Sequence, residues 1–270
     1  MEKRLIILFV GIGLLLGSCK DEPTTVVVPP KNDVVITPIE TVKTPNFNSD
    51  SAYQFIQTQV DFGPRVPNSK AHAKCATWLE NKLKNYGATT LVQEGEVTAF
   101  NNDKLQIKNI IGQFSPDKKE RVMLFAHWDT RPFADKDTKD KYKPIDGAND
   151  GGSGVGVLLE MARQFSIEQP TIGVDIIFFD AEDYGAFQGG MMQMPDDWCL
   201  GSQYWANNPP IANYKPKYGI LLDMVGGKDA TFPQEYLSVY FARNVVNKVW
   251  YAANQLGYSN YFINKELPSN

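Results

Sequence analysis

The sequence is poor in histidine and cysteine, and neither sign of charge dominates it. Its 270 residues contain only 2 histidines, His72 and His127, and 3 cysteines. Any metal site in this chain therefore has to rely mainly on carboxylates. Asp and Glu number 31 against 27 Lys and Arg, a net charge of −4, and the two signs are interspersed. This pattern offers no basic surface for nucleic acid, so we expect no nucleic-acid partner.

Long apolar runs are also scarce, and the clearest one lies at the N-terminus. Leu5 to Leu16 follows the basic pair Lys3-Arg4. A membrane-spanning helix needs about 20 apolar residues, so this run favours a signal peptide, residues 1–18. The string Leu16-Gly-Ser-Cys19 resembles a bacterial lipobox, which implies cleavage before Cys19 and lipidation of Cys19. We therefore expect a lipid-anchored protein of the bacterial cell envelope, on the periplasmic or surface face of the outer membrane.

Composition separates a tether from a globular domain. Residues 19–45 are rich in Pro, Thr and Val and show no helical periodicity. Such a segment is typical of an extended linker that holds a domain away from a membrane. Residues 46–270 are long enough for one domain with a sizeable core.

Within this domain, helical spacing alternates with short buried strands. We predict helices and strands at the following residues: helices 51–60, 71–86, 154–165 and 237–256, and strands 121–126, 174–179 and 218–222. Buried strands that alternate with helices predict an α/β fold, a three-layer α/β/α sandwich around a mixed, largely parallel sheet.

Polar residues follow each buried strand, where the functional residues of such sheets gather. They are His127 and Asp129, the glycine-rich loop Asp146–Gly154, Asp180 to Asp183, and Asp223. Each alone has a structural explanation, such as a hydrogen-bonded histidine, a helix start or a turn cap. The loop lacks the Gly-Lys-Ser/Thr ending of a phosphate-binding loop. Acidic groups converging on one edge repel one another unless a cation or protons intervene. The pattern therefore predicts a metal site with a carboxylate left for proton transfer.

Longer strings in the same region resemble a known family. The chain from about Asn48 to about Ile263 resembles the bacterial zinc-dependent glutaminyl-peptide cyclotransferases, members of the aminopeptidase-like zinc hydrolases. The strings are Val60-Asp-Phe-Gly-Pro-Arg65, Ala126-His-Trp-Asp-Thr-Arg131, Asp146-Gly-Ala-Asn-Asp-Gly-Gly-Ser-Gly-Val-Gly156, Phe178-Phe-Asp-Ala-Glu-Asp-Tyr184 and Trp198-Cys-Leu-Gly-Ser-Gln-Tyr-Trp205.

The resemblance implies a function and a set of roles. It implies conversion of N-terminal glutamine to pyroglutamate with release of ammonia, on peptides or proteins that begin with glutamine. One zinc ion per chain in an intact homologue would be held by Asp150 and Asp183. Glu182 would be the general acid/base and Asp223 a hydrogen-bond partner in the proton network. Trp198 would line the substrate pocket, although a core position is an equally good interpretation.

Two alternatives remain open at this point. In a two-zinc aminopeptidase of the same fold, His127 would be a ligand and Asp129 would orient it, whereas the resemblance to the cyclotransferases implies that His127 binds no metal. The resemblance also implies a third zinc ligand, a histidine near the C-terminus, and no histidine follows Asp223. We therefore expect a C-terminally incomplete domain whose residues 19–270 alone bind zinc weakly. An inactive truncated lipoprotein is the third hypothesis.

For three further residues we expect structural roles only. His72 lies near a helix start, where we expect a surface or capping residue. Cys75 and Cys199 remain once Cys19 is lipidated, and an oxidising envelope would permit a disulfide between them. Two separate thiols are at least as good an interpretation.

The lipidation hypothesis makes a direct prediction. Cys19→Ala removes the thiol that would carry the lipid, so the variant should move from the membrane fraction to the soluble fraction. Fractionation of cells that express each form measures this. A processed variant that stays in the membrane fraction would show that Cys19 is not the anchor.

Overall fold

The computed structural model describes residues 44–187 and 195–267. The predicted signal peptide and Cys19 lie outside these ranges, as does nearly all of the predicted tether. The helices and strands, in chain order, are α1 (Ser49–Asp61), α2 (Lys70–Asn85), β1 (Thr89–Thr98), β2 (Lys104–Phe114), β3 (Arg121–His127), α3 (Gly152–Ile167), β4 (Gly173–Phe179), the 3-10 turn η1 (Pro195–Asp197), α4 (Leu200–Asn207), β5 (Gly219–Leu221), β6 (Phe232–Glu235), α5 (Tyr236–Gln255) and β7 (Phe262–Leu267). Within the described ranges, each helix is too short or too polar to serve as a membrane span.

All of the predicted elements are present, within a few residues of their predicted bounds. Helices α1, α2, α3 and α5 and strands β3, β4 and β5 correspond to them. Strands β1, β2, β6 and β7 and helix α4 have no counterpart among the predicted elements. β1 and β2 form a long antiparallel pair, in register from Thr89 opposite Gln113 to Thr98 opposite Lys104.

The main sheet is mixed, as predicted. Its strand order is β1-β2-β4-β3-β5. β2 pairs with β4 in the antiparallel sense, whereas β3 lies parallel to both β4 and β5. β6 and β7 form a separate parallel pair, and α5 packs against both of them.

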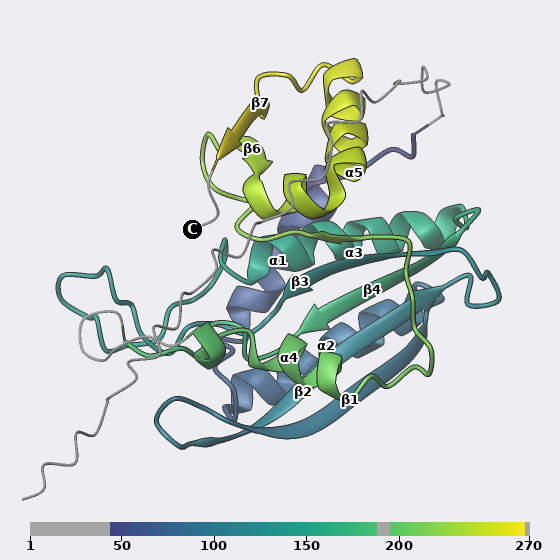
Figure 1. Ribbon diagram of the computed structural model, residues 1–270. Helices are drawn as coiled ribbons and strands as arrows, with labels where there is room; N and C mark the ends of the chain where they lie inside the picture. Colours follow the sequence, from purple (N-terminus) through teal and green to yellow (C-terminus); the bar gives the residue numbers. More distant parts are fainter. Residues whose placement is uncertain (1–43, 188–194, 268–270) are drawn as a thin grey trace, which may run out of the picture. The chain divides into compact units, whose positions relative to one another are not determined.

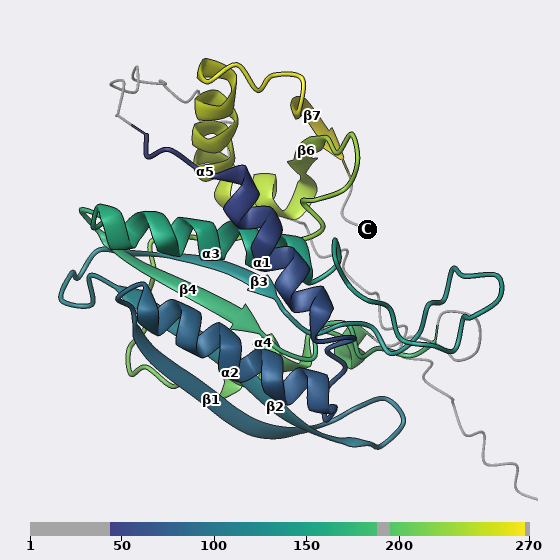
Figure 2. The same cartoon turned by 180° about the vertical axis from the view of Figure 1, so that it is seen from behind.

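Helices on the two faces of the main sheet make the sandwich three-layered, which confirms the predicted fold class. α1, α2 and α3 lie on one face and α4 on the other (Figures 1 and 2). Side chains along β3 alternate between the two faces of the sheet, so apolar residues on both faces have to be buried by helices. Val122 and Leu124 pack into the cluster under α2 and α3, whereas Met123 and Phe125 pack on the opposite face with Trp205 of α4.

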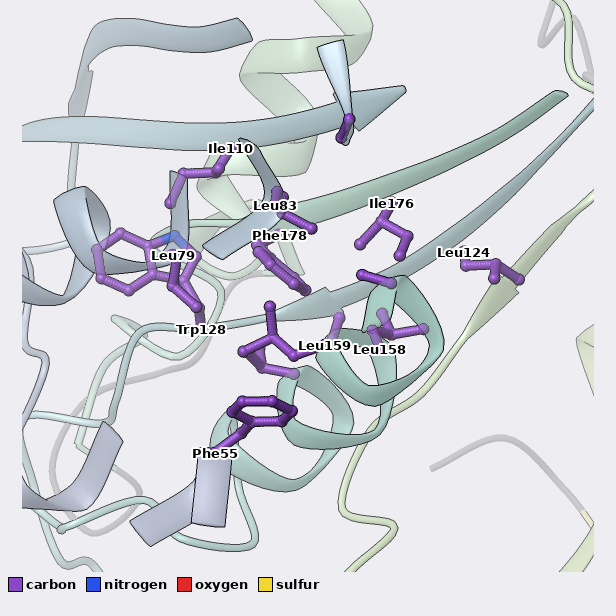
Figure 3. Packing of buried hydrophobic residues seen from close by; sticks show 14 of the residues in the cluster. Phe55, Leu79, Leu83, Ile110, Leu124, Trp128, Leu158, Leu159, Ile176 and Phe178 are labelled. Carbon is purple, nitrogen blue, oxygen red and sulfur yellow. The ribbon is translucent and has the colours of Figure 1, made fainter. Parts of the chain in front are cut away.

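The larger core cluster fixes the helices to the sheet. Figure 3 shows Leu79 of α2 and Leu158 of α3 beside the β4 residues Ile176 and Phe178, all of them fully buried. Burying an aliphatic or aromatic side chain of this size contributes roughly 1.5–3 kcal/mol. The cluster therefore holds β3 and β4 rigidly, and with them the loops that follow.

The parallel strands end at one edge, and α3 begins at the same edge. β3 ends at His127, β4 at Phe179 and β5 at Leu221. Gly154, in the first turn of α3, lies so close to β5 that an added Cβ would be 2.1 Å from the Leu222 carbonyl oxygen. Glycine at this position therefore allows α3 to start directly against the strand ends. The fold thus brings both ends of the connection between β3 and α3 to the loops that follow β4 and β5.

Candidate active site

His127 lies at the centre of the acidic residues that the sequence singled out. It is the last residue of β3 and is buried. Its Nε2 is 3.0 Å from Oδ1 of Asp150 and 3.3 Å from Oδ1 of Asp223. Its Nδ1 is 3.4 Å from Oδ1 of Asp129 and 3.9 Å from Oε2 of Glu182. Acids from the two ends of the β3–α3 connection, from the loop after β4 and from the loop after β5 therefore meet at one imidazole, as the strand-end pattern predicted.

Asp129 organises the acidic pair after β4. Its side chain is fully buried. Oδ1 accepts the backbone N–H of Glu182 at 3.0 Å, and Oδ2 accepts the backbone N–H of Asp183 at 3.2 Å. One carboxylate thus fixes the backbone of both residues. The sequence indicated Asp129 only as an orienting residue of the aminopeptidase alternative.

Burial and mutual repulsion shift the pKa values of the acids. Burial is the largest cause that raises the pKa of Asp183, to about 8, and the charges of Asp150 and Asp129 add to it. Burial also raises the pKa of Glu182; the charge of His127 opposes this, and those of Asp129 and Asp223 reinforce it. Both carboxyls therefore hold protons more tightly than exposed ones do.

His127 and Asp223 stabilise each other as an ion pair. Burial alone would lower the pKa of His127, but the carboxylates of Asp129, Asp150 and Asp223 outweigh it and raise that pKa well above the usual value. The pKa of Asp223 is lowered: burial would raise it, and the hydrogen bond and charge of His127 overcome that effect. A protonated His127 therefore offsets part of the negative charge.

The donor atoms fit a divalent cation. His127, Asp150 and Asp223 each offer one ligand atom, and these atoms lie within 4.8 Å of one another. In addition, Oδ2 of Asp183 is buried and has no hydrogen-bond partner among the described residues. A buried polar atom without a partner is costly, and a metal ion would satisfy it. Carboxylate oxygens and an imidazole are a donor set that suits zinc.

Glycine and one buried arginine shape the loop that carries Asp150. Gly151 has a φ of +78°, and an added Cβ would lie 2.4 Å from the Asp129 carbonyl oxygen. Arg65 is fully buried and donates to the carbonyl oxygens of Trp128, Asp146 and Gly147 at 3.4, 2.5 and 2.8 Å. It thereby ties together the two ends of the connection between β3 and α3. In the sequence, Arg65 ends the string Val60-Asp-Phe-Gly-Pro-Arg65, which gives no sign of this role.

Trp198 lies beside the site. Its ring stacks on the guanidinium of Arg131, whose carbon is 4.7 Å from the ring centroid. Nη1 of Arg131 is in turn 3.6 Å from Oδ1 of Asp183. Trp198 is therefore separated from a predicted metal ligand by one side chain, and its role in the substrate pocket stays a prediction.

The surface expectation for His72 is wrong. Its backbone N–H is bound by the Ser69 hydroxyl at the start of α2, as expected of a first-turn residue. Its ring, however, is buried, stacks on Trp128 at 4.5 Å and lies 2.7 Å from Oδ2 of Asp180. The same oxygen accepts the backbone N–H of Lys108. Asp180 is thus engaged in the core and is unavailable to the site.

Both described cysteines are free thiols. Cys75 is buried, and Sγ of Cys199 lies 3.5 Å from Oε1 of Glu182. This arrangement agrees with the interpretation as two separate thiols.

The sequence of the chain matches a known peptidase family. The model of peptidase family M28 matches residues 109–269. The chain therefore belongs to this family. Among curated proteins, it is 30% identical over 146 residues to bovine glutaminyl-peptide cyclotransferase, a match covering 46% of this chain and 38% of the relative. It is 29% identical over 188 residues to the aminopeptidase YwaD of Bacillus subtilis, covering 65% of this chain and 35% of that protein.

Solved structures give higher identities. The glutaminyl cyclase of Tannerella forsythia is 56% identical, with a TM-score of 0.82 over 84% of this chain and 78% of that chain. The glutaminyl cyclase of Bacteroides thetaiotaomicron, solved with N-acetylhistamine, is 48% identical, with a TM-score of 0.83 over 84% and 79%. A zinc-dependent exopeptidase from Parabacteroides distasonis is 53% identical, with a TM-score of 0.83 over 84% and 79%.

The pKa of Asp183 makes metal binding depend on pH. A carboxyl with a pKa of about 8 is mostly protonated at neutral pH, and a metal ion has to displace that proton. We expect zinc affinity to rise as pH rises toward that pKa, by up to about tenfold per pH unit for each proton displaced, and to level off above it. Calorimetric titration of the metal-free protein, in buffers of different ionisation enthalpy, measures both affinity and proton release. Affinity that stays constant between about pH 6 and pH 8 would contradict this.

Proposed function

We propose that the protein is a zinc-dependent glutaminyl-peptide cyclotransferase that converts N-terminal glutamine to pyroglutamate and releases ammonia. The observation that carries the proposal is Glu182, a carboxyl with a raised pKa beside a metal-fitting donor set. Such a group suits a residue that takes and returns a proton near neutral pH. Identities of 56% and 48% to two structures described as glutaminyl cyclases support the same choice. The substrates would be peptides or proteins that begin with glutamine.

Asp150 and Asp183 are the residues that would hold the zinc ion. When bound, zinc would polarise the side-chain carbonyl of the substrate glutamine as a Lewis acid. The repulsion among Asp150, Asp183 and Asp129 that raises the pKa of Asp183 is what a cation at this position would relieve.

The chain's own residues handle the proton. The α-amine of the substrate attacks its own side-chain amide carbon, so one C–N bond forms while the bond to the amide nitrogen breaks. Glu182 takes the proton that the amine loses and passes it to the departing ammonia. Asp223 accepts a hydrogen bond from the amide nitrogen and holds it in place. Because both reacting groups belong to one residue, their proximity supplies much of the rate.

A zinc aminopeptidase is the second candidate, and one observation favours it. Nε2 of His127 and the oxygens of Asp150 and Asp223 form a compact donor set, which a second metal ion would use. The similarity to an aminopeptidase and to a zinc-dependent exopeptidase supports this alternative. Two zinc ions per chain, and free amino acids rather than ammonia as product, would identify it.

The variant Glu182→Gln tests the acid/base role. The glutamine keeps the shape of the side chain but cannot carry the proton, so kcat for ammonia release from a Gln-initiated dipeptide should fall by about 10²–10⁴. Zinc content should stay at the wild-type value because Glu182 is not a proposed ligand. Glu168→Gln, on an exposed residue after α3, is the matched control and should change neither quantity. A Glu182→Gln variant without zinc would show that Glu182 and Asp183 have exchanged roles.

We further propose that the mature protein is attached to the cell envelope through a lipid on Cys19. The lipobox-like string Leu16-Gly-Ser-Cys19 after a short apolar run supports this. The Pro-rich residues 19–45 would then place the catalytic domain away from the membrane surface.

A further inference from the structure

The N-terminus of α4 docks on the loop that carries Glu182. The backbone N–H groups of Cys199, Leu200 and Gly201 donate to the carbonyl oxygens of Glu182, Ala181 and Asp180 at 2.9, 3.0 and 3.0 Å. The first N–H groups of a helix have no partner within the helix, and the side chain of the N-cap residue, Cys199, does not cap this one. The loop itself therefore satisfies them, and the helix end holds the loop in return.

Backbone strain marks both sides of this contact. Cys199 has a φ of +56° and Ala181 a φ of +49°, a region that residues with a Cβ rarely adopt and that costs of order 1–3 kcal/mol. Gly201 is needed for the close approach, because an added Cβ would lie 2.1 Å from the Asp180 carbonyl oxygen. Glycine would also suit the backbone of Cys199 better than cysteine does. The side chain of Cys199 therefore needs a separate explanation.

The thiol of Cys199 reaches the carboxylate that the proposed reaction uses. Its Sγ lies 3.5 Å from Oε1 of Glu182, while the other oxygen of Glu182, Oε2, lies 3.9 Å from Nδ1 of His127. Each oxygen thus faces a different neighbour. Burial, followed by the charge of Glu182, raises the pKa of the Cys199 thiol to about 12, so the sulfur keeps its proton and acts as a donor rather than a nucleophile.

We propose that Cys199 is a positioning residue whose thiol donates a hydrogen bond to Oε1 of Glu182 and holds that carboxylate in the orientation needed for proton transfer. This rests on the proposed function of Glu182. The contact limits rotation of the carboxylate, while the α4 N–H groups and Asp129 fix the backbone beneath it. No covalent step at sulfur is involved.

Kinetics of Cys199→Ala and Cys199→Ser separate positioning from packing. Both variants keep a Cβ at the strained backbone position, but only serine keeps a donor. We expect alanine to lower kcat by about tenfold, in line with the loss of a hydrogen bond to a charged group. KM should stay within about twofold, and serine should recover most of kcat. Ser202→Ala, on the same helix, has its hydroxyl on the Cys199 carbonyl oxygen rather than on Glu182 and should match wild type. An alanine variant with wild-type kcat, or one that changes only KM, would overturn the proposal.

Infrared spectroscopy tests the contact independently of activity. A thiol that donates a hydrogen bond absorbs at a lower S–H stretching frequency than a free one. The wild-type protein should show such a band. The band should be absent from Cys199→Ser and should shift to higher frequency in Glu182→Ala, while the bands of the other cysteines stay unchanged. A Cys199 band that does not respond to Glu182→Ala would refute the contact. If the wild-type protein shows the coupled band but releases no ammonia from Gln-peptides, the proposed function fails and the contact stands.

Discussion

The carboxylate of Asp129 receives the backbone N–H groups of both Glu182 and Asp183, and this ties the loop after β4 to the loop after β3. Neither acid belongs to a helix or strand, so regular backbone pairing does not fix either of them. A fully buried carboxylate is tolerable only when hydrogen bonds satisfy it. These two N–H groups serve that need, and the same bonds hold the acids beside His127.

Other contacts complete the frame around this pair of bonds. Arg65 holds the loop before α3 through three backbone carbonyls, which places Asp150. The N-terminus of α4 closes the opposite side of the Glu182 loop. The result is a rigid, buried arrangement of like charges. Burial first, and then the neighbouring carboxylates, raise the pKa of Asp183, and the carboxylates raise the pKa of His127 against the effect of burial. Relief of this repulsion by protons or by a cation is the physical basis for both metal binding and acid/base chemistry at this site.

The sequence predicted the central part of the fold because that part has a strong local signal. β3, β4 and β5 read as short apolar runs followed by polar residues, and the rule that parallel strands end at one edge then places the site. β1 gave no such signal, since only one of its residues is buried and it contains Glu94, Gly95 and Glu96. β2 did carry a sequence signal that predicts a strand. Its buried Leu105 and Ile107 alternate with polar neighbours, and this alternation is typical of a strand.

Contacts between residues far apart in the chain were beyond prediction from one sequence. His72 meets Asp180 across 108 positions, so the sequence near His72 could not reveal that its ring is buried. The contact of Cys199 with Glu182 depends on the αL backbone at Cys199 and on the close approach at Gly201. The roles of Asp150, Glu182, Asp183 and Asp223 came from a family resemblance. The geometry shows that these residues meet, and their roles stay predictions.

The zinc affinity and kcat of the Asp129→Asn variant test most directly whether Asp129 holds the two acids in place. Asparagine fits the same volume but replaces one acceptor oxygen with an NH₂ group, so the N–H of Glu182 or of Asp183 loses its partner. An unsatisfied buried donor costs about 1–3 kcal/mol, and we expect the loop to shift rather than bear that cost. Zinc affinity and kcat should then fall together, each by at least about tenfold, in a protein that remains folded. A folded Asp129→Asn variant that keeps both quantities within about twofold of wild type would contradict the account.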